Sequence, residues 1–213
     1  MIDLYTAATP NGHKVSIALE ELALPYTLKV LDLSKGEQKL PAFLAINPNG
    51  RIPAIVDHEA GGFAVFESGA CLMYLAEKTG QLMSQDPAQR YETIQWVMFQ
   101  MGGIGPMFGQ LGFFHKFAGK EYEDKRPLER YAAESKRLLG VLNGQLAERR
   151  WIVGDDYTIA DIAIFPWIMT HKAQGLTLAA NEVFLLAHWT GDRDLPSRFE
   201  VPFLVARMPD KQT

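Results

Sequence analysis

The chain has 213 residues, of which 47% are hydrophobic and 22% are charged, a composition that excludes a disordered protein. This length fits one large domain or two small ones. Lys and Arg number 21 against 25 Asp and Glu, and the resulting net charge of −4 argues against a general binder of nucleic acid or of anionic membranes. A small local pocket for an anion is still compatible with that balance.

The start of the chain and its cysteine content indicate the compartment. Residues 1–5 lack the basic and apolar regions of a secretory signal, and no segment approaches the roughly 20 apolar residues that span a bilayer. The single cysteine, Cys71, excludes an internal disulfide, a Cys-x-x-Cys redox pair and a zinc site with two cysteines. We therefore expect a cytoplasmic protein that binds neither membrane nor metal.

Residues 2–80 alternate short apolar runs with helical patterns. Strands are expected at 2–5, 27–31, 54–56 and 64–66, the last two as a hairpin. Helical spacing of apolar residues is found after residue 10 and again over residues 67–78. Strands interleaved with helices and followed by a hairpin indicate a small α/β layer with a mixed sheet.

From Asp86 onward the strand signals nearly vanish. Asp86 and Pro87 have the pattern of an N-cap followed by a first-turn proline. Residues 102–109 contain four glycines and a proline inside a helical pattern, which predicts a kink there. A long helical stripe covers residues 128–146, and Thr158 with Asp161 has the spacing of a capping box. The predicted division is an α/β domain over residues 1–80, a linker over 81–85 and an α-helical domain over 86–213.

The first candidate site is Thr9-Pro10-Asn11-Gly12-His13-Lys14, between the first strand and the first helix. Asn11 is expected to be the N-cap, and His13 and Lys14 stand in the first turn where a carboxylate would balance the helix dipole. A helix N-terminus without an internal acid is a plausible anion site, to which Thr9 could donate its hydroxyl. The alternative is an ordinary capped turn with a solvated threonine.

The second candidate is the segment over residues 47–56, which includes Arg51, Ile52 and Pro53. A proline directly before a buried strand cannot donate a hydrogen bond at its own nitrogen. If the Ile52–Pro53 bond were cis, the turn would expose the main-chain groups of Ile52 to a peptide-like ligand. The alternative is a trans proline at a strand edge.

The third candidate is Glu67 and Ser68, at the start of the helix over residues 67–78. An acid is expected there from the helix dipole alone. In a binding role, the Ser68 hydroxyl and amide would take a carboxylate while Glu67 takes an ammonium. The three candidates together supply anion donors, main-chain edge groups and one acid, a set that suits a zwitterionic peptide.

Motifs along most of the chain occur together in one known family. They lie at residues 2–5, 9–14, 47–57, 66–69, 74–77, 95–107, 129–131 and 157–163. From Met1 to about Ala173 the sequence resembles the cytosolic glutathione transferases, which join a thioredoxin-like N-terminal domain to an all-α C-terminal domain. Its Thr-Pro-Asn, Gly-Gly-x-Gly-Pro-Met and Glu-Arg-Tyr motifs are most similar to the bacterial nu class, the disulfide-bond reductases.

The resemblance implies a role for each site residue of the first domain. It places Thr9 and Asn11 beside the glutathione sulfur as the catalytic residues. The remaining residues would bind the rest of glutathione: Gln38 at the glycyl end, Arg51, Ile52 and a cis Pro53 around the cysteinyl unit, and Glu67 and Ser68 at the γ-glutamyl end.

The resemblance also implies a homodimer in which Arg130 reaches the glutathione site of the other subunit. Glutathione would be the thiol co-substrate, as two molecules or as the disulfide in each site. A helix N-terminus and a hydroxyl donor lower a thiol pKa and favour the thiolate that attacks a disulfide. We expect reduction of small disulfides with weaker transferase or peroxidase activity, and Cys71 as a buried small hydrophobe.

Two alternatives stay open on the same fold: a conventional conjugating transferase or peroxidase, and a noncatalytic glutathione-binding or regulatory protein. The C-terminal part departs from the family pattern from about residue 180, where Pro196, Pro202 and Pro209 forbid one long terminal helix. This segment is interpreted as a lineage-specific tail or as the result of a reading-frame change.

Overall fold

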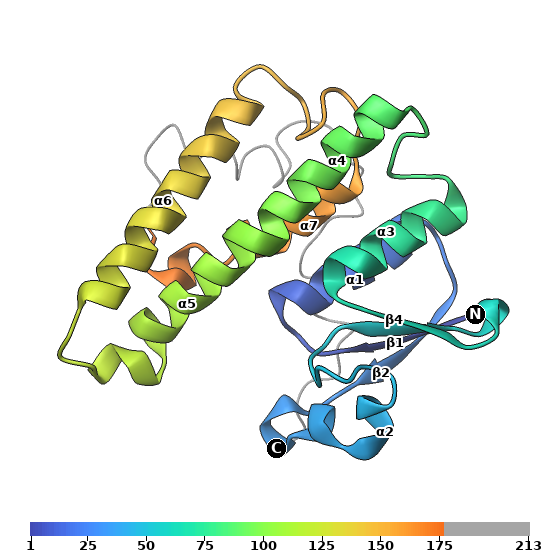
Figure 1. Ribbon diagram of the computed structural model, residues 1–213, viewed down its shortest axis with the longest axis horizontal. Helices are drawn as coiled ribbons and strands as arrows, with labels where there is room; N and C mark the ends of the chain where they lie inside the picture. Colours follow the sequence, from blue (N-terminus) through green and yellow to red (C-terminus); the bar gives the residue numbers. More distant parts are fainter. Residues whose placement is uncertain (177–213) are drawn as a thin grey trace. The chain divides into compact units, whose positions relative to one another are not determined.

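The computed structural model describes residues 1–176, so the atypical segment after residue 180 lies outside the described residues. The chain divides into two compact units, one formed by residues 1–84 and the other beginning at Gln85 (Figure 1). The first unit contains the sheet, and the described part of the second consists of helices, turns and two isolated β-bridges, which pair Trp151 with Gly154 and Val153 with Asp156. The predicted combination of an α/β layer with a helical domain is therefore confirmed.

The described part of the first unit contains a mixed four-stranded sheet in the order β2-β1-β3-β4. The strands are β1 (Ile2–Thr6), β2 (Tyr26–Val30), β3 (Ala54–Asp57) and β4 (Phe63–Phe66). Strand β1 is parallel to β2 and antiparallel to β3, which is antiparallel to β4. A parallel pair needs a crossover connection, and α1 (Pro10–Glu21) supplies it between β1 and β2.

Helices α1 and α3 (Ser68–Thr79) pack against each other and against the sheet. Their apolar rows meet the strands in an apolar core that includes Leu4, Leu19, Ile55 and Leu72, all without exposed surface. The connection between β2 and β3 contains 3₁₀ turns at Leu33–Lys35 and Glu37–Lys39 and the short helix α2 (Pro41–Leu44). A third 3₁₀ turn, His58–Ala60, joins β3 to β4.

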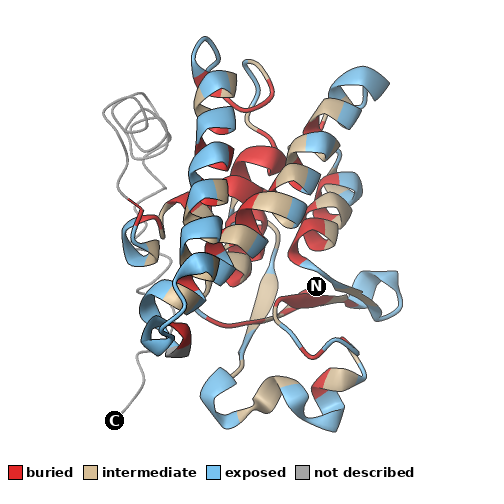
Figure 2. Ribbon diagram, turned by 60° about the vertical axis from the view of Figure 1, so that its left-hand side comes forward, coloured by how far each residue is buried: buried red, intermediate tan, exposed pale blue. Residues whose placement is uncertain are grey.

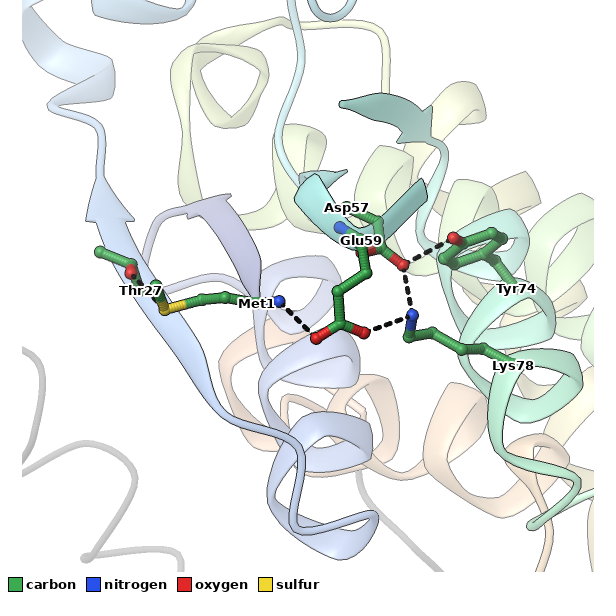
Figure 3. Close-up of polar contacts among 6 residues, drawn as sticks. All are labelled: Met1, Thr27, Asp57, Glu59, Tyr74 and Lys78. Atoms are coloured by element: carbon green, nitrogen blue, oxygen red, sulfur yellow. Dashed lines mark hydrogen bonds and ion pairs between the residues drawn. The ribbon is translucent and has the colours of Figure 1, made fainter. Parts of the chain in front are cut away.

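A buried carboxylate ties the end of β3 to α3 (Figure 3). The side chain of Asp57 is fully buried, and its Oδ2 lies 2.7 Å from the Tyr74 hydroxyl and 2.8 Å from the Lys78 ammonium. The Glu59 amide donates to Oδ1 at 2.9 Å, and the Glu59 side chain itself pairs with Lys78 at 3.0 Å. Burial raises the pKa of Asp57, but these donors outweigh it and lower the pKa to about 2.

The second unit begins with α4 (Pro87–Phe99), for which Asp86 is the N-cap and accepts a hydrogen bond from the Gln89 amide at 3.1 Å. A π-helical turn over Gln100–Ile104 separates α4 from α5 (Gly105–Lys116). An inserted π turn interrupts the regular ladder of helical hydrogen bonds. The glycine-rich segment therefore interrupts the helix within the region where the sequence predicts a kink.

A 3₁₀ turn at Ala118–Glu121 leads to α6 (Arg126–Leu146), and α7 (Ile159–Ile168) and a 3₁₀ turn at Lys172–Gln174 follow. Helix α6 buries one row that includes Leu138, Leu142 and Leu146 and exposes the opposite face. In Figure 2, buried residues (red) and exposed residues (pale blue) therefore alternate along this helix. Helix α7 is apolar except for Asp161 in its first turn, is buried along almost its whole length, and packs on α4 and the π turn. No helix within residues 1–176 is long and apolar enough to cross a bilayer.

The predicted capping box at Thr158 is present. Oδ2 of Asp161 accepts hydrogen bonds from the Thr158 amide at 3.0 Å and the Thr158 hydroxyl at 3.1 Å, and Oδ1 accepts from the Ile152 amide at 2.9 Å. Complete burial raises the pKa of Asp161 to about 6, although these three donors act in the opposite direction. One side chain thus caps α7 and fixes the preceding loop.

Candidate functional site

Strand register places the three candidate segments of the first unit at one end of the sheet. Tyr5 of β1 pairs with Ala54 of β3, which in turn pairs with Phe66 of β4. The segment from Thr9 follows β1, Ile52 and Pro53 precede β3, and Glu67 follows β4. Because β3 runs antiparallel to both neighbours, its start lies beside their ends. Segments far apart in the sequence therefore meet at this end.

The N-terminus of α1 differs from its predicted form in the identity of the cap. Thr9 has extended backbone geometry, and its Oγ1 accepts a hydrogen bond from the Gly12 amide at 3.2 Å. The prediction that Asn11 is the N-cap is wrong, because Pro10 takes the first helical position, where its missing N–H costs nothing. In accepting this bond, the Thr9 oxygen keeps its own proton available for donation.

The first turn of α1 carries no acidic residue, as the sequence predicts. This turn packs closely on the end of β1, so a Cβ at Gly12 would overlap the Ala7 carbonyl oxygen and Thr6 Oγ1. Asn11 is half-buried within this turn. The orphan amides and positive dipole of the helix N-terminus are thus held beside the Thr9 hydroxyl and the Asn11 amide.

The segment before β3 is shaped by Asn47, whose contribution the sequence did not reveal. This buried side chain donates to the Arg51 carbonyl at 2.6 Å and accepts from the Asn49 amide at 2.9 Å. The Ile52–Pro53 bond is cis, so the trans alternative is wrong. Ile52 lies two residues before the strand pairing begins at Ala54, so its main chain is at the end of the sheet and outside the β-ladder.

The other two candidates around this loop are Gln38 and Arg51. Gly50 has φ of +61°, and a Cβ there would come within 3.0 Å of the Gln38 carbonyl oxygen. Gln38 therefore lies directly beside the loop and is half-buried, whereas Arg51 is exposed. Positive φ and close approach both require glycine at position 50. The structure therefore places the Gln38 main chain beside the loop that contains Arg51 and Ile52.

At the third segment, Glu67 takes the cap position of α3 with φ of +71°, a conformation that is costly for a side chain with a Cβ. Its carboxylate makes no capping hydrogen bond and is exposed. Ser68 is the first residue of α3 and is only 2% exposed. Outlying backbone geometry of this kind clusters at ligand-binding positions.

Lys14 joins the first and third segments, a role that the sequence did not reveal. Its side chain is fully buried, and Nζ lies 3.2 Å from Ser68 Oγ. Burial lowers the pKa of Lys14 to about 7, with the charge of Glu67 acting in the opposite direction. The available signal was its position, because Lys14 is the one charged residue within the row that α1 buries against the core.

Cys71 is placed as the sequence predicts, inside the protein. Its Sγ is fully buried and lies 3.4 Å from the Val65 carbonyl oxygen. Burial, assisted by the charge of Glu67, raises the pKa of the Cys71 thiol to about 12. The chain therefore offers no reactive thiolate of its own.

Arg130 belongs to the helical unit, where it is exposed on α6. It lies off the buried row of Ser135, Leu138 and Leu142. The sheet register therefore gathers the candidates of the first unit but does not include Arg130.

Family models match both units. The model described as "Glutathione S-transferase, N-terminal domain" matches residues 8–78, and that described as "Glutathione S-transferase, C-terminal domain" matches residues 104–190. Among curated proteins, the disulfide-bond oxidoreductase YfcG of Escherichia coli K12 is 49% identical over 183 residues, which cover 84% of each chain.

Two solved structures extend the similarity to the fold. A glutathione transferase family member from Pseudomonas fluorescens pf-5, described with two glutathione bound, is 55% identical with a TM-score of 0.83, covering 89% of this chain and 88% of that one. A glutathione transferase from Pseudomonas putida, described with one glutathione disulfide per subunit, is 52% identical with a TM-score of 0.83, covering 92% and 87%. On these similarities and on its thioredoxin-like sheet and helical unit, the chain belongs to the glutathione S-transferase family.

Proposed function

We propose that this protein is a glutathione-dependent thiol–disulfide oxidoreductase that reduces small disulfides. The observation that carries the proposal is the first turn of α1, where the Thr9 cap keeps a hydroxyl proton for donation and no acid opposes a bound anion. The chain's own thiol, Cys71, is buried and protonated. The name of YfcG and the glutathione disulfide described for the Pseudomonas putida protein support the same reaction.

In this proposal the α1 N-terminus generates the nucleophile. A free thiol with a pKa near 8.5 is only about 3% thiolate at pH 7. The positive end of the helix dipole and hydrogen bonds from Thr9 and Asn11 favour the anionic form of the glutathione sulfur. The protein thereby raises the concentration of thiolate without contributing a sulfur.

The remaining contacts hold the peptide in place. Ile52 pairs through its main chain with the cysteinyl unit, with Arg51 and Pro53 beside it, and Gln38 takes the glycyl end. Glu67 binds the ammonium of the γ-glutamyl group, and Ser68 binds its carboxylate. These assignments agree with the gathering of the three segments at one sheet end.

The reaction needs two glutathione molecules and no other reductant. The first thiolate attacks one sulfur of the substrate disulfide, and the other sulfur leaves as a thiolate that takes up a proton. The second glutathione thiolate attacks the glutathione sulfur of the mixed disulfide and releases the second substrate thiol. The substrate gains two electrons, and two glutathione molecules become one glutathione disulfide. The Pseudomonas fluorescens relative is described with two bound glutathione molecules.

The proposal includes the organisation of the chain. Residues 1–80 form the glutathione-binding domain, 81–85 the linker, and 86–213 the helical domain. Two copies form a homodimer in the cytoplasm, and Arg130 of one subunit completes the glutathione site of the other. Small disulfides are the main substrates, and conjugation to electrophiles and peroxide reduction are slower side activities.

Replacement of Thr9 tests the proposal. Thr9→Val keeps the shape of the side chain but removes the hydroxyl, and a hydrogen bond to a charged group contributes about 1.5–3 kcal/mol. We expect kcat/KM for hydroxyethyl disulfide to fall roughly tenfold to a hundredfold or more. Thr9→Ser retains the cap and the donor and is the matched control, with activity close to that of the parent protein.

Loss of the cap also costs about 1 kcal/mol of unfolding free energy, so all rates are measured where every variant is folded. Equal turnover by the parent protein and the Thr9→Val variant would remove Thr9 from catalysis. Faster turnover of an aryl halide than of hydroxyethyl disulfide would instead identify a conjugating transferase. Glutathione binding without turnover of either substrate would identify a noncatalytic binding protein.

A further inference from the structure

We propose that Asn47 is a positioning residue that turns the main-chain N–H of Ile52 toward the cysteinyl carbonyl of glutathione. The inference rests on the proposed function, because it takes glutathione as the ligand and pairs it with the main chain of Ile52. It adds to the recognition of the peptide a buried side chain that acts through the main chain and does not itself touch the ligand.

Asn47 organises the turn that leads into β3. Its main-chain N–H donates to the Phe43 carbonyl at 2.9 Å, and its carbonyl accepts from the Gly50 amide at 2.9 Å. Its side chain donates to the Arg51 carbonyl at 2.6 Å and accepts from the Asn49 amide at 2.9 Å. Because only 1% of Asn47 is exposed, little water competes for these bonds, and they hold the turn in one conformation.

The side-chain amide of Asn47 satisfies both of its partners in only one orientation. The Asn49 N–H is a donor and has to meet the oxygen Oδ1, whereas the Arg51 carbonyl is an acceptor and has to meet the nitrogen Nδ2. Rotation of the amide by half a turn would place donor against donor and acceptor against acceptor. The chemistry of the two partners therefore fixes the donor that the Arg51 carbonyl receives.

The bond to the Arg51 carbonyl also sets the direction of the next N–H. The peptide unit between Arg51 and Ile52 is trans, and in a planar trans peptide the C=O and the N–H point in opposite directions. With the Arg51 carbonyl held on Asn47, the Ile52 N–H points away from the buried turn. Within the part of the chain that the structure describes, this N–H makes no hydrogen bond. A backbone donor of this kind needs an acceptor, and a ligand carbonyl supplies one.

Phe43 anchors the turn to the sheet. Its side chain is buried, and its ring centroid lies 5.9 Å from that of Tyr5 on β1. Tyr5 pairs in turn with Ala54, the first residue of β3. The peptide plane before Ile52 is therefore held from the packed part of the first unit. A donor that is already oriented loses little freedom when the ligand binds, and this preorganisation raises affinity.

The test makes the same chemical change at two positions of this turn. Asn47→Asp keeps the acceptor for the Asn49 amide but replaces the donor to the Arg51 carbonyl with an oxygen, so the peptide plane is released. We expect the Kd for glutathione, measured by calorimetry, to rise about threefold to tenfold, which corresponds to the loss of one hydrogen bond. Asn49→Asp adds the same charge at an exposed residue and is the matched control, with a Kd close to that of the parent protein.

Two further measurements follow the Ile52 N–H itself. In amide NMR spectra, glutathione should move the Ile52 amide proton of the parent protein downfield, and this shift should be lost in the Asn47→Asp variant. An alkene isostere of the cysteinyl–glycyl peptide bond lacks the carbonyl that accepts from Ile52, so its Kd should be the same for the parent and the variant. Asn47→Ser, which is neutral and too short to reach the Arg51 carbonyl, is measured in parallel and replaces the aspartate variant if that one does not fold.

The outcomes distinguish the two proposals. No glutathione binding by the parent protein would overturn the proposed function. Normal binding by the parent together with an unchanged Kd for both Asn47 variants would overturn only the role of Asn47. Equal losses for glutathione and for the alkene isostere would also overturn it, because they would show damage to the whole site. An Ile52 amide shift that persists in a weakened variant would have the same consequence.

Discussion

At the scale of single residues, the position of sulfur is the main chemical fact. Cys71 lies in the first turn of α3 and is fully buried, which raises the pKa of its thiol to about 12. At pH 7 only about one thiol in 100,000 would be ionised at such a pKa. Any thiolate chemistry in the proposed site therefore depends on sulfur that enters with the ligand.

Cys71→Ala should consequently leave disulfide reduction within about twofold of the parent rate. The expected loss of stability is about 1 kcal/mol, typical of a small change in a packed core. Stopped-flow alkylation of the native parent protein should show a thiol that reacts only on unfolding. A large loss of activity in a folded Cys71→Ala variant would contradict a reaction that uses ligand sulfur alone.

Features of helix starts could be predicted from the sequence where they depend only on residues a few positions apart. The absence of an acid in the first turn of α1 and the capping box of Thr158 and Asp161 follow from residue type and spacing, and both are present. The prediction that Asn11 is the N-cap of α1 is wrong because it considered only the capping preference of the side chain. Proline favours the first helical position, so Pro10 begins the helix and Thr9 is its cap. Lys14 could not be assigned to Ser68, because that contact joins residues 54 positions apart.

At the scale of elements, β3 and α3 are joined through the buried carboxylate of Asp57 (Figure 3). Its folded pKa of about 2 is below its ordinary value, so ionised Asp57 favours the folded state at pH values above about 4. That contribution is lost as the pH falls through the folded pKa. Removal of Lys78 should leave the burial of Asp57 poorly opposed and raise its pKa.

Lys78→Met should therefore lower the free energy of unfolding, and the difference from the parent protein should shrink as the pH falls from 7 to 4. Protonation of Asp57 in the variant relieves the unpaired buried charge over this range. Urea denaturation at several pH values measures the difference, with Lys29→Met as control, because Lys29 is exposed on β2. A difference that does not change with pH would show that Lys78 acts through packing alone.

Most elements were predictable because their patterns are strong. The strands of the first unit and helices α3, α4 and α6 lie close to their predicted ranges, since each buries one face with a regular period. The π turn at Gln100–Ile104 was predicted only as a kink, because composition shows that a helix is weakened but not which hydrogen bonds replace the regular ones. The cis bond before Pro53 was expected only from the family resemblance, and the sheet order depends on contacts between distant segments.

At the scale of the whole molecule, the proposed homodimer makes a distinct prediction for Arg130. Sedimentation should give a mass of twice 23.8 kDa. Arg130→Ala should raise the KM for glutathione about tenfold, the loss expected for a charge-assisted contact. Arg137→Ala is the control, because Arg137 is also exposed on α6 and pairs with Glu134 at 2.7 Å.

Mixed dimers show whether Arg130 acts across subunits. In a dimer of one Arg130→Ala subunit and one Thr9→Val subunit, one site has both an intact Thr9 and an intact Arg130 if the arginine comes from the other chain. Activity should then appear on subunit exchange between the two weak parents. If exchange restores nothing, Arg130 does not complete the partner's site.

The register of the sheet also has a practical consequence. Pairing of Tyr5, Ala54 and Phe66 gathers the candidate ligand contacts at one end, so the β3–β4 hairpin turn at Gly61 and Gly62 is at the other end. Both glycines are exposed, and a Cβ at either would meet no neighbour within 4 Å. A peptide tag inserted between them could carry a fluorophore or attach the protein to a surface. Either use would leave the ligand end of the sheet open.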